Sequence, residues 1–105
     1  MTMLPNGCLR PQITDEEVAL ALDMMGKLWR SRLEQKGRGA TASPHESFGI
    51  IAEEVDEMLD ALRANDERAF TGEALDIGVA CLLAIGSALA HGRESPPPPA
   101  QGKES

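Results

Sequence analysis

The sequence predicts an all-α fold: a small antiparallel bundle of three main helices, completed by oligomerisation. Apolar residues recur at three- and four-residue steps over three segments, at about 15–35, 44–64 and 66–91. Only 3% of the 105 residues are aromatic, which disfavours a β-sheet protein. The third segment is apolar on nearly every side from residue 75 to 89, so we expect further copies of the chain to cover it.

The first two helices have clear start signals. Thr14 and Glu17 have the spacing of a capping box, so the first helix should begin there and fade near residue 35. Ser43 before Pro44 offers an N-cap followed by proline at the first helical position. The apolar stripes predicted to face the core comprise Val18, Leu22, Met25 and Trp29 in the first helix, and Phe48, Ile51, Val55, Met58, Leu59 and Leu62 in the second.

The chain divides into an arm, a domain and a tail. Residues 1–13 contain two prolines and no periodicity, so we expect a flexible N-terminal arm before a helical domain at 14–92. We expect the third helix to stop at Gly92, with His91 as a capping residue. Residues 93–105 include four consecutive prolines and are predicted to be a disordered tail.

The charge and the apolar content restrict the partners. The net charge is −7, whereas binding to a nucleic acid polymer or an acidic membrane surface needs a basic footprint. Residues 46–76 alone carry −8. The longest apolar run has about 14 residues, fewer than a membrane span needs. Two cysteines give no disulfide framework and no secretory signal opens the chain, so we expect a cytoplasmic protein.

The acidic residues follow helical spacing. Glu54 and Glu57 lie three residues apart in the second segment, as Glu73 and Asp76 do in the third. If the two helices pack antiparallel, the two acidic pairs can face each other. Such convergence is costly unless cations neutralise it, and oxygen-only ligands favour Mg²⁺ or Mn²⁺.

The alternative is a solvated acidic face on a purely structural bundle, since glutamate-rich helix surfaces are common. Two observations count against it. Ile50 and Ala61 flank Glu54 and Glu57, so that side of the second helix is expected to be partly covered. Acids at 73 and 76 interrupt an otherwise apolar helix, and buried acids seldom occur unpaired.

The acidic pattern also carries a family resemblance. The string EExxE at 53–57, then fifteen residues, then ExxD at 73–76 resembles the signature of the MazG-like all-α nucleoside triphosphate pyrophosphohydrolases, over residues 44–90. The resemblance implies a Mg²⁺-dependent enzyme, a homodimer or homotetramer, that cleaves a nucleoside or deoxynucleoside triphosphate to the monophosphate and pyrophosphate. It implies Glu54, Glu57, Glu73 and Asp76 as metal ligands, and Glu53 as a further ligand or the residue that orients the attacking water.

One departure from the family keeps a second hypothesis open. Many members place Asn or Asp one or two turns after ExxD, whereas the first polar side chain after Asp76 here is Ser87. The alternative function is therefore a catalytically weak or inactive module of the same fold that binds nucleotide or metal.

Candidate substrate-binding residues lie mainly in the first helix. Trp29 can stack on a nucleobase, although it also fits the core stripe. His45 lies in the first turn of the second helix, where it can lie near the substrate, although an exposed histidine without a role is the favoured interpretation. Basic side chains near the end of the first helix can reach phosphates or simply complement the helix C-terminus: Lys27, Arg30, Arg32, Lys36 and Arg38.

Overall fold

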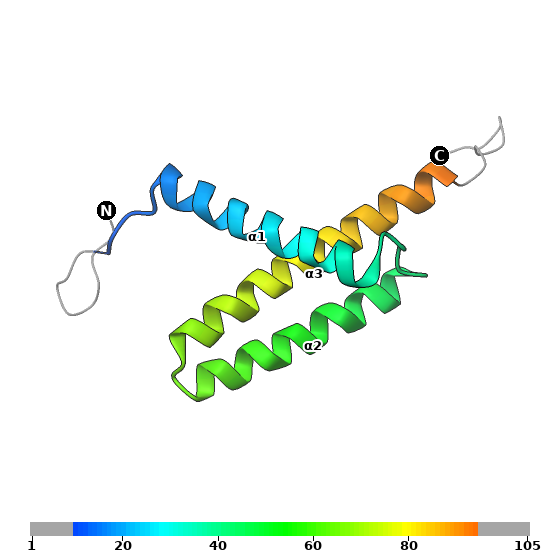
Figure 1. Ribbon diagram of the computed structural model, residues 1–105. Helices are drawn as coiled ribbons and strands as arrows, with labels where there is room; N and C mark the ends of the chain where they lie inside the picture. The colour runs from blue at the N-terminus through cyan, green and yellow to red at the C-terminus, as the bar shows by residue number, and fades with distance from the viewer. Residues whose placement is uncertain (1–9, 95–105) are drawn as a thin grey trace, which may run out of the picture.

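The computed structural model describes residues 10–94 (Figure 1). Three helices account for most of this part of the chain: α1 (Asp15–Lys36), α2 (Pro44–Arg63) and α3 (Glu67–Glu94). No strand occurs among the described residues. The predicted all-α class and the three helices are confirmed, with ends that agree to within three residues. The predictions for 1–9 and 95–105 lie outside the described residues.

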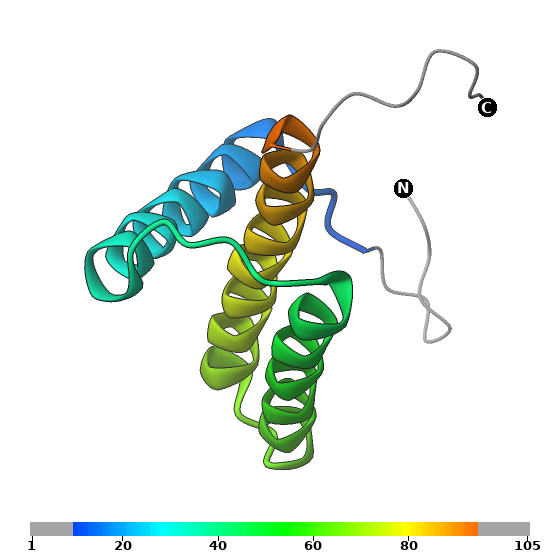
Figure 2. The same cartoon turned by 90° about the vertical axis from the view of Figure 1, so that its right-hand side faces the viewer.

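The central element is α3. It forms an antiparallel hairpin with α2, and α1 crosses it on the other side (Figures 1 and 2). No Cα atom of α1 lies within 8 Å of one in α2, so the two contact the rest of the fold through α3. Figure 2 shows the linker at 37–43 passing across α3 to join them. Both other helices therefore pack against α3.

The predicted helix starts are confirmed by their hydrogen bonds. The Thr14 hydroxyl accepts from the Glu17 N–H at 3.1 Å, and the Glu17 carboxylate accepts from the Thr14 N–H at 2.8 Å. The Ser43 hydroxyl accepts from the Glu46 N–H at 3.3 Å. These bonds satisfy backbone donors that a helix leaves free in its first turn.

The turn between α2 and α3 is a tight one. Asn65 has φ 56°, in the left-handed region that asparagine tolerates better than most residues, and it reverses the chain. Asp66 then caps α3, because its carboxylate accepts from the Ala69 N–H at 3.0 Å. The tightness of this turn forces α2 and α3 to run side by side.

The expected stop of the third helix at Gly92 is wrong. α3 continues through Gly92 to Glu94, and His91 is not a cap. Nε2 of His91 lies 2.7 Å from the Thr41 carbonyl oxygen in the linker. Tertiary contact with the linker therefore stabilises the last turns against the weak helix propensity of glycine.

Thr41 anchors the linker. Its N–H donates to the hydroxyl of Ser87 at 2.9 Å, and its own hydroxyl lies 2.6 Å from that of Ser47. All three residues are buried, so these polar groups are satisfied by one another. We call Thr41, Ser47 and Ser87 the hydroxyl cluster; it joins the linker, α2 and α3.

The apolar stripe predicted for α2 is only partly buried. Phe48 is 69% exposed and Leu62 57% exposed, and Val55 and Leu59 are exposed as well. In α1, Val18 and Leu22 are exposed while Met25 and Trp29 are half-buried. The buried or half-buried side chains of α2 are Ser47, Ile50, Ile51, Ala52, Glu54, Met58 and Ala61.

The expectation of a self-covered apolar stripe on α2 is therefore wrong at four of six positions. The two buried residues of α2 are both small, Ser47 and Ala61, and the Ser47 hydroxyl lies 2.6 Å from that of Thr41, so the bulkier apolar residues lie on the outer side of the helix. The buried apolar core of the described residues is small: Ala61, Val79, Ala80 and Leu83.

By length and composition alone, α3 is apolar enough to cross a membrane. Only 22% of the part of α3 that meets this test is buried within the described chain. The core helix of a soluble bundle meets the same test, and α3 packs against both other helices here.

Candidate metal centre

Antiparallel packing of α2 on α3 brings acidic side chains from both helices together. Glu54, Glu57 and Glu73 each offer a carboxylate oxygen, and these atoms all lie within 4.8 Å of one another. We call these three residues the glutamate cluster. Its donor set is oxygen only, which suits a hard divalent cation such as Mg²⁺ or Mn²⁺.

Two oxygens of the glutamate cluster lack partners. Oε1 of Glu54 and Oε1 of Glu73 are buried from solvent and form no hydrogen bond within the described part of the chain. A buried carboxylate oxygen without a partner is destabilising, since it has lost its hydration and gained nothing in return. A proton or a cation bound at the cluster would supply the missing partner.

The pKa values of the acidic side chains show that ionising several of them together is unfavourable. Burial, followed by the charges of Glu57, Asp76 and Glu73, raises the pKa of Glu54 to about 7. Burial also raises the pKa of Glu73, with the neighbouring Glu57 as the next cause. Burial, followed by the charge of Glu57, raises the pKa of Asp76. The carboxylates therefore favour neutralisation.

Asp76 stands beside the glutamate cluster rather than within it. It lines, together with Glu54, a groove of about 350 Å³ bounded by all three helices. The α1 side of this groove is formed by Leu28, Ser31, Arg32, Gln35 and Lys36, and the rest by Ile50, Val79, Ala80 and Leu83. The cluster is thus next to a hollow large enough for a small ligand.

The remaining residues predicted for the site are spread out. Glu53 is exposed and does not belong to the glutamate cluster, because one residue of offset turns its side chain about 100° around α2. Lys27 pairs with Asp23 at 3.1 Å on the surface of α1. Arg30 and His45 are exposed, and neither they nor Lys27 line the groove.

Trp29 occupies a separate place. It is half-buried and lines a smaller pocket of about 140 Å³ between α1, the linker and α3. The guanidinium carbon of Arg32 lies 5.8 Å from the centre of its ring, a cation–π contact. Arg32 lines both this pocket and the groove, so the two hollows are neighbours.

Sequence reasoning missed part of the groove. Ser31 and Gln35 were not considered, and Arg32 and Lys36 were not distinguished from the other cations of α1. Their four-residue spacing was a usable signal, since residues i and i+4 share a helix face. Which face of α1 meets α3 depends on tertiary packing.

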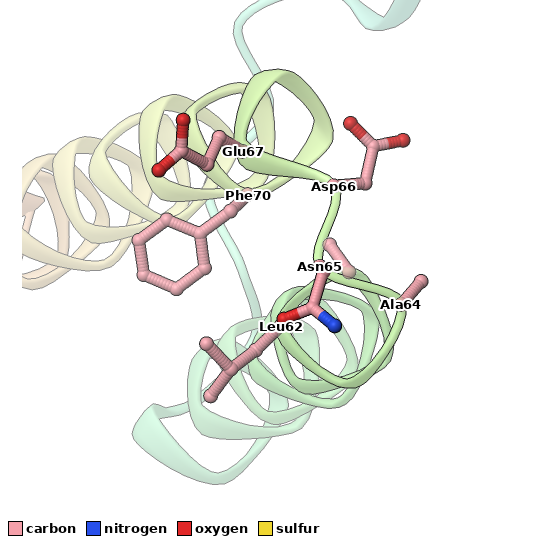
Figure 3. Close-up of a pocket in the computed structure, with 7 residues that line it drawn as sticks. Leu62, Ala64, Asn65, Asp66, Glu67 and Phe70 are labelled. Atoms are coloured by element: carbon pink, nitrogen blue, oxygen red, sulfur yellow. The ribbon is translucent and has the colours of Figure 1, made fainter.

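A larger hollow, of about 750 Å³, lies at the α2–α3 turn. Figure 3 shows Leu62 and Phe70 on the same side of this turn, with Asp66 on the other. Both apolar side chains are exposed, and Asp66 is engaged in capping α3. This hollow is therefore an open apolar concavity rather than a site with converging polar groups.

Comparison of the chain with family models, curated proteins and solved structures found no match.

Proposed function

We propose that the protein is a Mg²⁺-dependent nucleotide pyrophosphohydrolase of the MazG-like type, which cleaves a nucleoside or deoxynucleoside triphosphate to the monophosphate and pyrophosphate. The single observation that carries this proposal is the convergence of Glu54, Glu57 and Glu73, two of them with a buried oxygen that lacks a partner. An acidic surface without a ligand-binding role would leave its carboxylates hydrated instead.

The acidic residues of the site are assigned separate roles. Glu54 and Glu73 would hold Mg²⁺, or Mn²⁺, with Glu57 and with Asp76 at the edge of the groove. The bound cation supplies charge neutralisation for the triphosphate. Glu57 is the exposed member of the cluster, so it would be the first carboxylate that water entering from solvent meets.

In the proposed reaction, a water oxygen bonds to the α-phosphorus while the bond between the α-phosphorus and the α–β bridging oxygen breaks, and that oxygen stays on the pyrophosphate. Pyrophosphate leaves with the electron pair of that bond, and the proton of the water passes to a site carboxylate. Glu53 is assigned no contact with the cation because its side chain lies outside the glutamate cluster.

The test is pyrophosphate release from a panel of common and damaged triphosphates with Mg²⁺ or Mn²⁺. Glu57→Gln and Asp76→Asn should each lower kcat by about 10²-fold or more, since each removes a charge that balances the cation. Glu53→Gln is the matched control: an exposed acid on the same helix, expected to keep most of the activity. No pyrophosphate from any triphosphate at micromolar protein would reject the enzyme.

A second function, a binding module without turnover, has its own supporting observation. Ser87, the first polar side chain after Asp76 on α3, is buried and bonded to the Thr41 N–H. It is therefore engaged by the linker rather than directed at a substrate. Calorimetry with a non-hydrolysable triphosphate separates the two functions: binding without pyrophosphate release from the natural triphosphate supports the module.

We also propose that the chain forms a homodimer or homotetramer in the cytoplasm. The exposed apolar residues of α2 and α3 are more than an isolated small domain usually presents: Phe48, Val55, Leu59, Leu62, Phe70, Leu82, Ile85 and Leu89. A second copy offering the same face would bury both sets.

A further inference from the structure

Two cations of α1 share the groove with two of the acids. Arg32 and Lys36 line it together with Glu54 and Asp76. Since they are four residues apart, both cations lie on one face of α1, a single turn from each other. Figure 2 shows α1 and α2 on different sides of α3, and the groove is lined by Arg32 and Lys36 of α1 together with Glu54 of α2.

The two cations and the two acids that line the groove form no ion pair with each other. Between residues 10 and 94, ion pairs within 4.0 Å join only Lys27 to Asp23 and Arg93 to Glu94. Arg32 and Lys36 thus remain separated from the carboxylates, although all four line one cavity of about 350 Å³. A ligand that fits this arrangement carries positive charge toward Glu54 and negative charge toward α1.

Arg32 is placed for such a ligand. Its guanidinium lies over Trp29, which lines the neighbouring smaller pocket, and donates to the Gly37 carbonyl at 3.4 Å; these contacts restrain the group without using most of its five N–H donors. A guanidinium held in this way is suited to bidentate binding of phosphate oxygens. Lys36 in the last turn also complements the helix dipole, but that role does not explain Arg32, a full turn earlier.

We propose that Arg32 and Lys36 form an anion subsite that binds the phosphate oxygens of a polyphosphate whose divalent cation is held by the glutamate cluster. This rests on the proposed function, since the polyphosphate enters with that cation. It assigns to α1, which contributes none of the clustered acids, the positioning of the phosphate chain. Of the five cations of α1 and the linker, Arg32 and Lys36 would bind the ligand, whereas Lys27, Arg30 and Arg38 would not.

The experiment is calorimetric titration of the full chain with inorganic tripolyphosphate in the presence of Mg²⁺, a probe without a base or sugar. Arg32→Gln and Lys36→Gln should each weaken binding about tenfold, as loss of a charge-assisted hydrogen bond predicts. Lys27→Gln and Arg30→Gln are matched controls from the same helix and should bind as the unchanged protein does. Arg32→Lys should recover part of the affinity.

The outcomes separate this inference from the function it rests on. If Mg²⁺ alone raises the melting temperature and tripolyphosphate binds, but Arg32→Gln and Lys36→Gln match the two controls, the anion subsite is rejected and the metal centre stands. If neither Mg²⁺ nor tripolyphosphate binds, both are rejected. If the Arg32→Gln protein does not fold, the affinity of Lys36→Gln alone tests the anion subsite. Lys36 is exposed, so its substitution should leave the fold intact.

Discussion

Glu54 of α2 and Glu73 of α3 approach within 4.8 Å across the helix interface, and each keeps one buried carboxylate oxygen without a hydrogen-bond partner in the described chain. Two such groups side by side make the interface locally unfavourable when both are ionised.

Mg²⁺ should stabilise the fold through Glu73. With about 10 mM Mg²⁺ and a millimolar dissociation constant, the expected gain in unfolding free energy is on the order of 1 kcal/mol. Glu73→Gln should abolish most of this gain, and should raise the melting temperature of the metal-free protein because it removes a buried like charge. Differential scanning fluorimetry with and without EDTA measures both effects, and Glu67→Gln serves as an exposed acid of the same helix.

Without metal, stability should fall as the pH rises through the range of Glu54. Its pKa in the folded protein is about 7, above its ordinary value of 4.5. Between these values the folded state holds a proton that the unfolded chain has released, so stability is full below pH 4.5 and is lost by about pH 7. Melting temperatures at pH 5 and pH 8 measure this. Glu54→Gln should flatten the dependence, and a rise in stability with pH would contradict the assignment.

Ser87→Ala should destabilise the protein by about 1–2 kcal/mol, because the Thr41 N–H loses its acceptor in a buried place. Chemical denaturation gives this free energy directly. Ser31→Ala removes an exposed hydroxyl from α1 and should change stability by less than about 0.5 kcal/mol. Equal effects of the two substitutions would show that the hydroxyl cluster does not hold the linker.

The exposed apolar face should control the oligomeric state. Light scattering on detergent-free protein should give a dimer or tetramer, and Phe48→Ser with Leu62→Ser should shift it toward the monomer. Leu20→Ser, also at an exposed leucine but on α1, is the control and should leave the assembly unchanged. A monomer before any substitution, or protein recovered only in detergent, would contradict self-association.

Gly78→Ala should gain less stability than Gly49→Ala, although both replace a helical glycine. A Cβ at Gly49 meets nothing within 4 Å, so the expected gain is about 0.5–1 kcal/mol. At Gly78 the added Cβ would lie 2.5 Å from Cε of Met25, so the Met25 side chain must move. If that side chain cannot move, α1 must shift instead. Paired denaturation curves test the difference.

The helices could be predicted because their signals are local. The capping signals at Thr14 and Ser43 act within one turn, and the structure places both as expected. The acidic spacing brings Glu54, Glu57 and Glu73 together, whereas Asp76 lies beside them. The burial of Glu54 beside Glu73 followed from the same local geometry once an antiparallel hairpin was assumed.

The face of each helix that packs inward could not be predicted in the same way. Hydrophobicity pointed to Phe48 and Leu62, but α2 turns Ser47 and Ala61 toward the interior. The hydroxyl of Ser47 lies 2.6 Å from that of Thr41, whose N–H donates to Ser87 of α3, so contacts outside α2 favour this orientation and have no signature within that helix. The selection of Arg32 from five neighbouring cations depended on the same tertiary packing.

The groove has a mechanical property that follows from the path of the chain. Its α1 and α2 sides have no Cα atoms within 8 Å of each other and are held in place by α3 and by the linker tied down at Thr41. A molecule that binds both sides would add a link between two helices whose only other connections are the linker and their shared packing on α3. Amide hydrogen exchange along α1 should therefore be slower in the protein with a ligand bound in the groove than in the protein without it.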